Sequence, residues 1–496
     1  MNLGVNDRFN FAATVPPAEQ LGPVHFIAIG GSGMSGVARM FLDRGVAVSG
    51  SDSQDSETLR ELEAAGATVH VGHDPAHLGE ARTVVVSSAV REDNPELAAA
   101  REQGLVVLHR SQGIAALLYG ADTVAVAGAN GKTTTSAMAV VALQAAGADP
   151  SYVIGAAVGR GPSAARGRGS AFVVEADESD GSFVVYHPQV AVVTNVKPDH
   201  LDFYGGLDLI EDAFTRFAGT VREGGLLVAC ADDEGARRLA ERYRLAGGTV
   251  ATYGTVAEAD LRLERLRPDA ATATADLVWA RDLGPVTGGS TKALSVPMPG
   301  AHNLMNAAAA LLAVTAGLGV DVDRALAGLA DYPGAHRRFE RVGAAAGVTV
   351  VDDYAHNPDK VAAVVAAGRG LVADPDSGLQ RLVVLFQPHL YSRTRDFADG
   401  FADALAPADV VVLMDVYGAR EDPVPGVDGD TIGARLRDRR DRAAEVHYVA
   451  ERDAVVPTLA DLVRPGDLVL TVGAGDVTRL GPPLLDELRR REGGQP

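Results

Sequence analysis

The chain has 496 residues, 47% of them hydrophobic, and a net charge of -20. This length predicts about three globular domains. The acidic balance argues against general nucleic-acid binding, which needs basic faces to neutralise phosphates. We find no signal-peptide pattern and no apolar run of the roughly 18 residues that span a membrane, so we expect a cytoplasmic protein without a membrane partner. A single cysteine excludes an intrachain disulfide framework.

The N-terminal part combines a polar arm with a glycine turn. Residues 1–20 are polar and contain two adjacent prolines, which predicts a flexible arm. A buried-strand pattern then runs into Gly30-Gly-Ser-Gly-Met-Ser-Gly36, and we expect a helix from residue 37. The next strand ends near Asp52, about 20 residues after Gly31, the spacing of a ribose-binding acid in a dinucleotide fold. Taken alone, this glycine turn predicts an NAD-dependent dehydrogenase.

A second glycine turn predicts a nucleoside triphosphate site. An apolar run at residues 124–127 ends in Gly128, and Gly131, Lys132 and Thr133 then open another expected helix. Glycines let backbone N–H groups converge on phosphate oxygens, the lysine supplies a cation, and the hydroxyl can hold Mg²⁺. The G-x-x-G-K-T spacing is shorter than the usual P-loop.

Four carboxylates follow the buried strand expected at residues 171–174. They are Glu175, Asp177, Glu178 and Asp180. Mg²⁺ prefers oxygen ligands beside nucleotide phosphates, so we interpret this run as part of the nucleoside triphosphate site and expect Glu175 to share a metal with the Thr133 hydroxyl. His200 follows the next strand, but histidine is an uncommon Mg²⁺ ligand, so its chemistry alone leaves a structural role open.

Cationic and imidazole side chains gather in the last third of the chain. They are Arg337, Arg338, His356, His389, Arg393, Arg395 and Arg420. In an acidic chain this cluster predicts anion binding, although any single arginine can equally belong to a surface salt bridge. Together these residues could stabilise a phosphate, a carboxylate or the oxyanion of an acyl-transfer intermediate.

The recurrence of buried strands followed by polar residues predicts three successive α/β domains, each with its chemistry at the carboxyl ends of the strands. Eight ordered motifs across residues 24–480 resemble the Mur ligase family. They are Gly30-Gly-Ser-Gly-Met-Ser-Gly36, Gly128-Ala-Asn-Gly-Lys-Thr-Thr134, Glu175-Ala-Asp-Glu-Ser-Asp180, Thr194-Asn-Val-Lys-Pro-Asp-His200, His302-Asn-Leu-Met-Asn306, Arg337-Arg-Phe339, Asp352-Asp-Tyr-Ala-His-Asn-Pro358 and Pro388-His-Leu-Tyr-Ser-Arg-Thr-Arg395.

The resemblance implies a fold and an activity. After the arm, it implies a Rossmann-like UDP-sugar-binding domain at residues 21–120, a central P-loop ATPase-like α/β domain at 121–332 and a C-terminal Rossmann-like α/β domain for the amino acid at 333–496. It also implies ATP- and Mg²⁺-dependent ligation of L-alanine to the lactyl carboxylate of UDP-N-acetylmuramate, through an acyl phosphate, in peptidoglycan synthesis. Domain closure is then expected to assemble the site.

The family's functional residues are carried over position by position. UDP-sugar contacts fall on Gly31, Ser32, Gly33, Met34, Ser35, Gly36, Asp52, Ser87, Ser88, Ala89 and Val90. ATP contacts fall on Gly128, Ala129, Asn130, Gly131, Lys132, Thr133, Thr134, Asn303, Asn306, Arg338 and Asp353, with the adenine beside the two asparagines of the helix. Metal ligands fall on Thr133, Glu175 and His200. Catalytic roles fall on Lys132, His200, Arg338, His356, His389, Arg393, Arg395 and Arg420. The first glycine turn thus becomes a UDP-sugar site in place of an NAD site.

Three departures from the family pattern leave alternatives open. Ala129-Asn130 stands where threonine and histidine are common, Asn357 where a second histidine is usual, and Leu390 where arginine is common. Thr215 stands where some sibling ligases carry a modified lysine, as expected for the alanine-adding branch. The alternatives are a related ligase that adds a preformed peptide to UDP-N-acetylmuramate, the dehydrogenase, and a non-catalytic ATP switch.

Overall fold

The computed structural model describes residues 8–159, 161–268, 272–419, 421–439 and 445–493. The chain divides into two compact units: residues 1–266, 274–296 and 302–333 form the first, and residues 267–273, 297–301 and 334–496 form the second. Three sheets carry the architecture, and we call them the first, central and third sheets in chain order.

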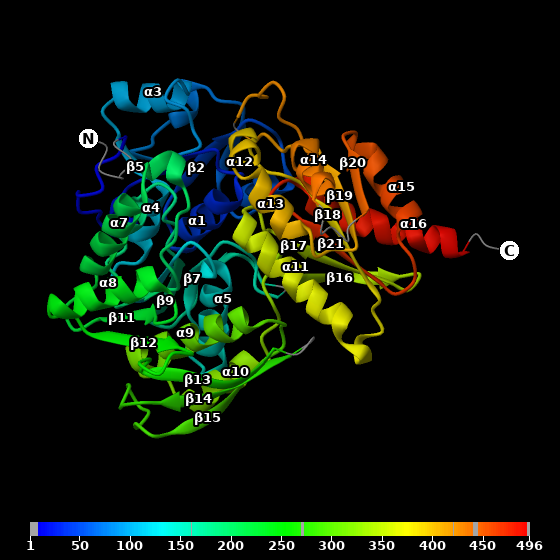
Figure 1. Cartoon of the computed structure of the whole chain (residues 1–496). Helices are drawn as coiled ribbons and strands as arrows, with labels where there is room; N and C mark the ends of the chain where they lie inside the picture. Colours follow the sequence, from blue (N-terminus) through cyan, green and yellow to red (C-terminus); the bar gives the residue numbers. More distant parts are fainter. Residues whose placement is uncertain (1–7, 160, 269–271, 420, 440–444, 494–496) are drawn as a thin grey trace. The chain divides into compact units, whose positions relative to one another are not determined.

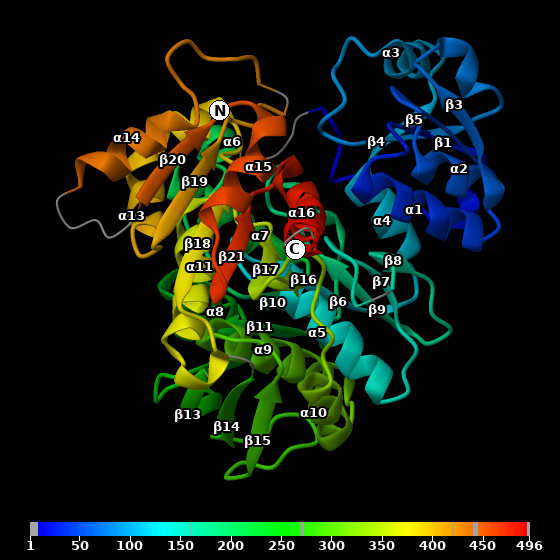
Figure 2. The same ribbon diagram turned by 90° about the vertical axis from the view of Figure 1, so that its right-hand side faces the viewer.

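The first sheet has five parallel strands in the order β3-β2-β1-β4-β5. The strands are β1 (Val24–Ile27), β2 (Val48–Asp52), β3 (Thr68–Val71), β4 (Thr83–Val86) and β5 (Val106–His109). The helices are α1 (Ser32–Asp43), α2 (Glu57–Ala64), α3 (Pro95–Glu102) and α4 (Arg110–Leu117), with 3-10 turns at Ala18–Gln20 and Pro75–Leu78 (Figure 2). The strand order reverses between β1 and β4, and ligands of such sheets bind at the carboxyl ends beside this switch point.

The central sheet has ten strands in the order β15-β14-β13-β12-β11-β10-β6-β9-β7-β8. The strands are β6 (Asp122–Ala127), β7 (Ser151–Val153), β8 (Ala164–Ala165), β9 (Ala171–Glu175), β10 (Val190–Val193), β11 (Leu226–Cys230), β12 (Val250–Gly254), β13 (Leu261–Pro268), β14 (Ala273–Trp279) and β15 (Thr291–Val296). Strand β6 pairs in parallel with β9 on one side and β10 on the other, so the polar segments that follow these three strands meet at one edge.

Six helices and a 3-10 turn at Ser182–Val185 accompany the central sheet. The helices are α5 (Lys132–Ala145), α6 (Leu201–Tyr204), α7 (Leu207–Gly219), α8 (Glu234–Leu245), α9 (Ala301–Leu318) and α10 (Val322–Ala330). Among the described residues, α9 alone is long and apolar enough to cross a membrane by length and composition, but 67% of it is buried inside the protein. Helix α9 is therefore a core helix, and its small alanine side chains allow close packing against its neighbours.

The third sheet has the order β16-β17-β21-β18-β19-β20, and only β16 is antiparallel to its neighbour among the described strands. The strands are β16 (Glu340–Ala345), β17 (Val348–Asp353), β18 (Arg381–Phe386), β19 (Val410–Met414), β20 (Glu445–Val449) and β21 (Asp467–Val472). The helices are α11 (Pro358–Ala373), α12 (Tyr391–Asp396), α13 (Ala398–Leu405), α14 (Asp430–Asp438), α15 (Arg452–Leu462) and α16 (Gly481–Gly493), with 3-10 turns at Pro375–Ser377 and Asp476–Leu480. Helices α11, α13 and α14 bury one face of this sheet, and α15 and α16 bury the other (Figure 1).

The prediction of three α/β domains is confirmed by these sheets, but two local expectations need correction. Helix α1 begins at Ser32 and not near residue 37, because Gly31 is its N-cap and the later glycines lie inside the helix. A Cβ on Gly36 would lie 2.7 Å from the Cβ of Ala164, so close packing against β8 requires glycine there. The segment expected to be a flexible arm lies outside the described residues up to residue 7.

From residue 8 onward, this segment contacts the first sheet. Phe9 is buried, and its ring centroid lies 5.0 Å from that of His109. The Arg8 guanidinium donates to the carbonyl oxygens of Ser88 (3.3 Å) and Val90 (2.8 Å). Phe9 and Phe11 supply the apolar surface that anchors this segment to the first sheet. The two prolines favoured a flexible arm and gave these aromatic residues too little weight.

Candidate active site

The phosphate loop, residues 128–134, connects β6 to α5. Gly128 and Gly131 have φ values of 136° and 85°, a backbone region that L side chains rarely adopt. Asn195, just after β10, braces the loop by accepting a hydrogen bond from the Asn130 N–H (2.9 Å). Thr194 Oγ1 donates to the Asn130 carbonyl oxygen (2.6 Å). The loop is therefore held open at the N-terminus of α5, where backbone N–H groups and the helix dipole favour anions.

Lys132 forms a buried ion pair with one residue of the acidic segment 175–180. Its Nζ donates to Glu178 Oε2 (2.7 Å), to Glu178 Oε1 (2.9 Å) and to the Gly128 carbonyl oxygen (2.8 Å). Burial alone would lower the pKa of the Lys132 ammonium, but the charges of Glu178 and Asp177 outweigh it and raise this pKa. The lysine is therefore a permanent cation beside the phosphate loop. The sequence indicated the acidic segment, but not which carboxylate Lys132 contacts.

Thr133 and Glu175 meet at the same edge of the sheet. Thr133 Oγ1 donates to Glu175 Oε1 (3.0 Å), and the Gly155 N–H donates to Glu175 Oε2 (2.6 Å). A hydroxyl and a carboxylate side by side are the oxygen donors that Mg²⁺ takes next to nucleotide phosphates. Within the described part of the chain, no three His, Cys, Asp or Glu side chains are grouped to hold a metal by themselves. These two residues therefore fit a metal whose other ligands are phosphate oxygens and water.

His200 lies at the start of α6 in a left-handed conformation (φ 52°). Its Nε2 is 3.9 Å from Asp199 Oδ1, and its imidazole lies near the Asp177 carboxyl. Burial alone would raise the pKa of the Asp177 carboxyl, but the charges of Lys132 and Arg110 outweigh it and lower this pKa to about 2. The imidazole is thus close to the acidic segment without being part of the Thr133 and Glu175 pair.

Two asparagines of α9 lie behind the phosphate loop. Asn303 and Asn306 are buried, and Asn306 Nδ2 donates to Asn303 Oδ1 (3.4 Å). Asn306 Oδ1 accepts from Thr135 Oγ1 (3.3 Å), and a Cβ on Gly131 would lie 2.5 Å from it. Asn306 therefore packs against the phosphate loop at Gly131 and the start of α5. Its predicted contact with adenine stays a prediction.

The candidate UDP-sugar residues lie at the carboxyl ends of β1, β2 and β4. Asp52 Oδ2 accepts the Gly30 N–H (3.0 Å), which ties the end of β2 to the glycine turn. Met34 is buried inside α1, and the side chain of Ser32 lies outside what the structure describes. The predicted residues at positions 87–90 form the turn after β4, closed by a hydrogen bond from the Val90 N–H to the Ser87 carbonyl oxygen (3.1 Å).

A polar cluster links this turn to the acidic segment. Asp180 Oδ2 accepts from Ser88 Oγ and lies 3.2 Å from His109 Nε2. His109 Nδ1 accepts the Ser111 N–H (3.2 Å), so Nε2 carries the proton and donates to Ser88 Oγ (3.0 Å), which in turn donates to Asp180. Burial lowers the pKa of His109 to about 4 although the charge of Asp180 opposes this shift. A neutral histidine thus connects the first and central sheets within the first unit.

In the second unit, Asp353 and Arg338 flank Tyr354. Asp353 accepts the N–H groups of Phe339 and Ala355, both at 2.8 Å. Burial raises the pKa of the Asp353 carboxyl although Arg338 opposes the shift. The Arg338 guanidinium lies 5.0 Å from the centre of the Tyr354 ring.

His356, His389 and Arg393 come together in the second unit. The His356 and His389 ring centroids are 5.9 Å apart, and His389 stacks on Tyr417 at 5.9 Å. His356 Nδ1 donates to the Tyr354 carbonyl oxygen (2.9 Å), so Nε2 is the free acceptor of the neutral ring. Burial, Lys360 and Arg393 lower the pKa of His356 well below its usual range.

The other predicted cations of this unit are placed differently. Arg395 is exposed and pairs with its neighbour Asp396 (2.7 Å), so the structure does not bring it to the histidines. Arg337 Nη2 donates to the carbonyl oxygens of Gly473 (2.6 Å) and Gly475 (3.3 Å), which is a structural role. Arg420 lies outside the described residues.

The departure at Asn357 has a structural explanation, and that at Leu390 has none. The Asn357 side chain caps α11 by accepting the Lys360 N–H (2.9 Å), a role for which asparagine is favoured. Leu390 is buried at the N-cap of α12 with a positive φ of 70°. Neither position presents a charge to a ligand. Ala129 is likewise buried beside the phosphate loop.

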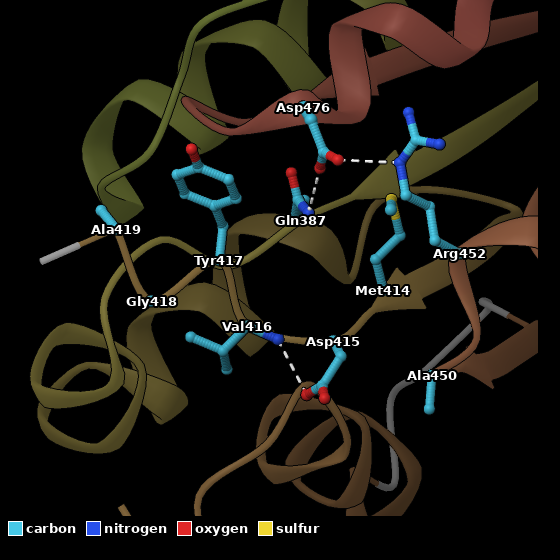
Figure 3. A pocket seen from close by; sticks show the side chains of 10 residues that line it. All are labelled: Gln387, Met414, Asp415, Val416, Tyr417, Gly418, Ala419, Ala450, Arg452 and Asp476. Atoms are coloured by element: carbon cyan, nitrogen blue, oxygen red, sulfur yellow. Dashed lines mark hydrogen bonds and ion pairs between the residues drawn. The ribbon is translucent and has the colours of Figure 1, made fainter. Parts of the chain in front are cut away.

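A pocket of about 340 Å³ opens at the carboxyl ends of four strands of the third sheet (Figure 3). Its lining residues are Gln387, Met414, Asp415, Val416, Tyr417, Gly418, Ala419, Ala450, Arg452 and Asp476. Asp476 accepts from Gln387 Nε2 and from Arg452 Nε, both at 2.8 Å. One cation and two carboxylates in a small pocket suit a zwitterion. The sequence offered no signal for Arg452, which begins a helix after the edge strand.

A phosphate loop facing carboxylates, in a chain with two further α/β domains, is the arrangement of an ATP-dependent ligase. Three family models match the chain in succession: "Mur ligase family, catalytic domain" at residues 23–120, "Mur ligase middle domain" at 126–314 and "Mur ligase, glutamate ligase domain" at 337–475. The chain belongs to the Mur ligase family. This membership decides against the dehydrogenase interpretation of the first glycine turn.

Individual relatives indicate which members of the family this chain is similar to. The chain is 53% identical to a UDP-N-acetylmuramate--L-alanine ligase of Kineococcus radiotolerans, over 97% of this chain and 99% of the relative. The crystal structure of a UDP-N-acetylmuramate-alanine ligase from Thermotoga maritima matches with a TM-score of 0.76 and 28% identity, over 95% of this chain and 100% of that one. A murein peptide ligase from Psychrobacter arcticus matches with a TM-score of 0.68 over 94% and 99%, but at 23% identity it shows the fold alone.

Proposed function

We propose that this protein joins L-alanine to the lactyl carboxylate of UDP-N-acetylmuramate, with ATP as the energy source, in the cytoplasmic synthesis of peptidoglycan precursors. One observation carries the proposal. The phosphate loop places Lys132 and Thr133 against two carboxylates, in a chain that is 53% identical over 97% of its length to a ligase named for this reaction.

The phosphate loop binds the triphosphate, and the acidic segment would hold its metal. Backbone N–H groups at the N-terminus of α5 receive phosphate oxygens, and Lys132 exchanges Glu178 for phosphate when ATP enters. Thr133 and Glu175 would hold Mg²⁺, which neutralises charge on the phosphoryl group when bound. His200 is assigned to the reacting carboxylate side of this site.

The reaction activates a poor electrophile. An oxygen of the lactyl carboxylate attacks the γ-phosphorus, ADP leaves, and an acyl phosphate forms. The amine of L-alanine then attacks the acyl carbon, and phosphate leaves with the former carboxylate oxygen. Lys132 stabilises charge on the transferring phosphoryl group. Arg338 and Arg393 supply cations, and Arg420 keeps its predicted catalytic role as part of the proposal. Arg395 could join them only by exchanging its partner Asp396 for the substrate.

The second unit supplies the amine-handling groups. His356 is neutral, with Nδ1 committed to the Tyr354 carbonyl oxygen, so its Nε2 offers a lone pair toward the amine. His389 lies against the same ring and against Tyr417, which lines the strand-end pocket. The carboxylates and the Arg452 cation of that pocket complement the ammonium and carboxylate of an amino acid.

A phosphate-release assay separates this function from the peptide-adding alternative. We would incubate the protein with UDP-N-acetylmuramate, ATP and Mg²⁺ and vary the amine among L-alanine, L-serine, glycine and a tripeptide. The proposal predicts the highest kcat/KM with L-alanine and a uridine nucleotide product heavier by one alanine residue. A preference for the tripeptide would favour the peptide-adding ligase, and no amine-dependent phosphate from any amine would refute both.

A further inference from the structure

Arg110 lies between the glycine turn and the acidic segment of the first unit. It is the first residue of α4, directly after β5. A Cβ on Gly33 would lie only 2.4 Å from Arg110 Nη1, so the guanidinium covers the first turn of α1 at a place that only glycine leaves open. On its other side, Arg110 Nη2 is 3.8 Å from Asp177 Oδ2.

The guanidinium of Arg110 makes only one long ionic contact among the described residues. Across the described ranges, its ionic contact with Asp177 is longer than a hydrogen bond, and the guanidinium donates no hydrogen bond. The Arg110 and Asp177 side chains are 32% and 45% exposed, so both can be reached from solvent. Arginine carries five donors in a planar fork that matches phosphate oxygens. A chain with 65 acidic and 45 basic residues must place such cations locally to bind an anion.

The neighbourhood of Arg110 favours an anionic ligand. The turn residues 30–36 and the N-terminus of α1 lie at the carboxyl end of β1, next to the switch point at which parallel sheets bind ligands. Backbone N–H groups at this helix start favour an anion, and Arg110 adds a full positive charge on the same side.

We propose that Arg110 binds the diphosphate of the UDP-sugar and exchanges its contact with Asp177 for phosphate oxygens when that substrate enters. The inference rests on the proposed function, because it assigns a residue to the UDP-sugar of that reaction. Asp177 belongs to the segment that also carries Glu175 and Glu178. Binding of the UDP-sugar therefore releases a carboxylate of the ATP site from its arginine partner.

Direct binding measurements test this assignment without turnover. We would titrate UDP-N-acetylmuramate calorimetrically into wild type, Arg110→Ala, Arg110→Lys and the control Arg60→Ala, in the absence of ATP and amine. Arg60 is exposed in the same domain and pairs with Asp55, outside the proposed site. Loss of a charged hydrogen-bonding group predicts Kd raised about 10- to 100-fold for Arg110→Ala, an intermediate value for Arg110→Lys and wild-type affinity for the control.

Truncated ligands distinguish a phosphate contact from a structural role. With UDP as the probe, Arg110→Ala should lose affinity as it does for the full substrate, whereas with uridine, which lacks phosphates, the two proteins should bind equally. The KM for ATP should stay within about twofold. Equal loss for uridine and UDP would overturn the assignment, because it would indicate a distorted domain.

A second variant probes the position of the guanidinium itself. Gly33→Ala places a methyl group against Arg110 Nη1, the far end of a flexible side chain, so the protein should fold while the guanidinium is displaced. Gly33→Ala should weaken UDP binding in the wild-type background more than in Arg110→Ala. Equal effects in both backgrounds, or wild-type affinity of Arg110→Ala for UDP, would refute the inference. If wild type binds neither UDP-N-acetylmuramate nor UDP, the proposed function itself fails.

Discussion

Replacing Lys132 by methionine should damage stability and turnover by two separable mechanisms. The Lys132 and Glu178 side chains are only 13% and 3% exposed, and Nζ donates to both oxygens of that carboxylate. Lys132→Met leaves the Glu178 charge buried without its cation. Breaking a buried pair from one side costs about 3–5 kcal/mol, so the ratio of folded to unfolded protein should fall by more than 100-fold.

The double variant Lys132→Met/Glu178→Gln separates the two effects. A neutral amide in place of the carboxylate removes the uncompensated charge, so most of the lost free energy of unfolding should return. Turnover should stay absent, because no cation is left to stabilise the transferring phosphoryl group. We would measure the free energy of unfolding by urea titration and amine-dependent phosphate release for wild type and both variants.

Two results would refute this reasoning. If Lys132→Met unfolds at the wild-type urea concentration, the Glu178 carboxylate does not depend on this cation for its burial. If the double variant releases phosphate at the wild-type rate, Lys132 is not the phosphate-binding lysine. Retained binding of UDP-N-acetylmuramate by both variants is the control, since the glycine turn lies on another sheet.

Three further variants test other parts of the site and the fold. Glu175→Gln should raise the Mg²⁺ concentration for half-maximal phosphate release about tenfold or more, because a carboxylate ligand is lost, and an unchanged Mg²⁺ titration would contradict the metal assignment. Gly131→Ala should raise the KM for ATP strongly, because φ is 85° and the new Cβ would lie 2.5 Å from Asn306 Oδ1; a wild-type KM would contradict this geometry. Burial alone would raise the pKa of Glu96, but the nearby His25 imidazole (3.6 Å) and hydrogen bonds with Ser51 and His77 lower this pKa from 4.5 to about 2. Glu96 therefore stabilises the fold fully above pH 4.5 and loses this contribution of about 3 kcal/mol as the pH falls toward 2. Urea titrations across this pH range should show a smaller pH dependence for Glu96→Gln, and an identical slope would contradict it.

The sequence predicted those parts of the site that follow from strand order along one edge. The phosphate loop after β6 and the acidic segment after β9 are local patterns, and parallel pairing brings their ends together automatically. The start of α1 was misplaced, because glycines inside a helix look like a turn until the close contact of Gly36 with β8 is known. Local propensity cannot report such a tertiary contact.

Sequence patterns could not predict side-chain contacts between residues that lie far apart in the sequence. Which of four carboxylates pairs with Lys132 depends on how the segment 175–180 turns after its strand, and the answer is Glu178. Arg452 begins a helix whose partner Asp476 follows a different strand. Arg395 shows the converse, because a family motif placed it near the amino acid while its side chain pairs with its neighbour on the surface.

The central claim is that ATP activates the lactyl carboxylate as an acyl phosphate, and isotope transfer tests it most directly. UDP-N-acetylmuramate labelled with ¹⁸O in both carboxylate oxygens would be converted with ATP, Mg²⁺ and L-alanine, and the phosphate and amide products analysed by mass spectrometry. The mechanism predicts one ¹⁸O in each phosphate released and one retained in the amide carbonyl. Unlabelled phosphate, or ¹⁸O appearing in AMP, would contradict it.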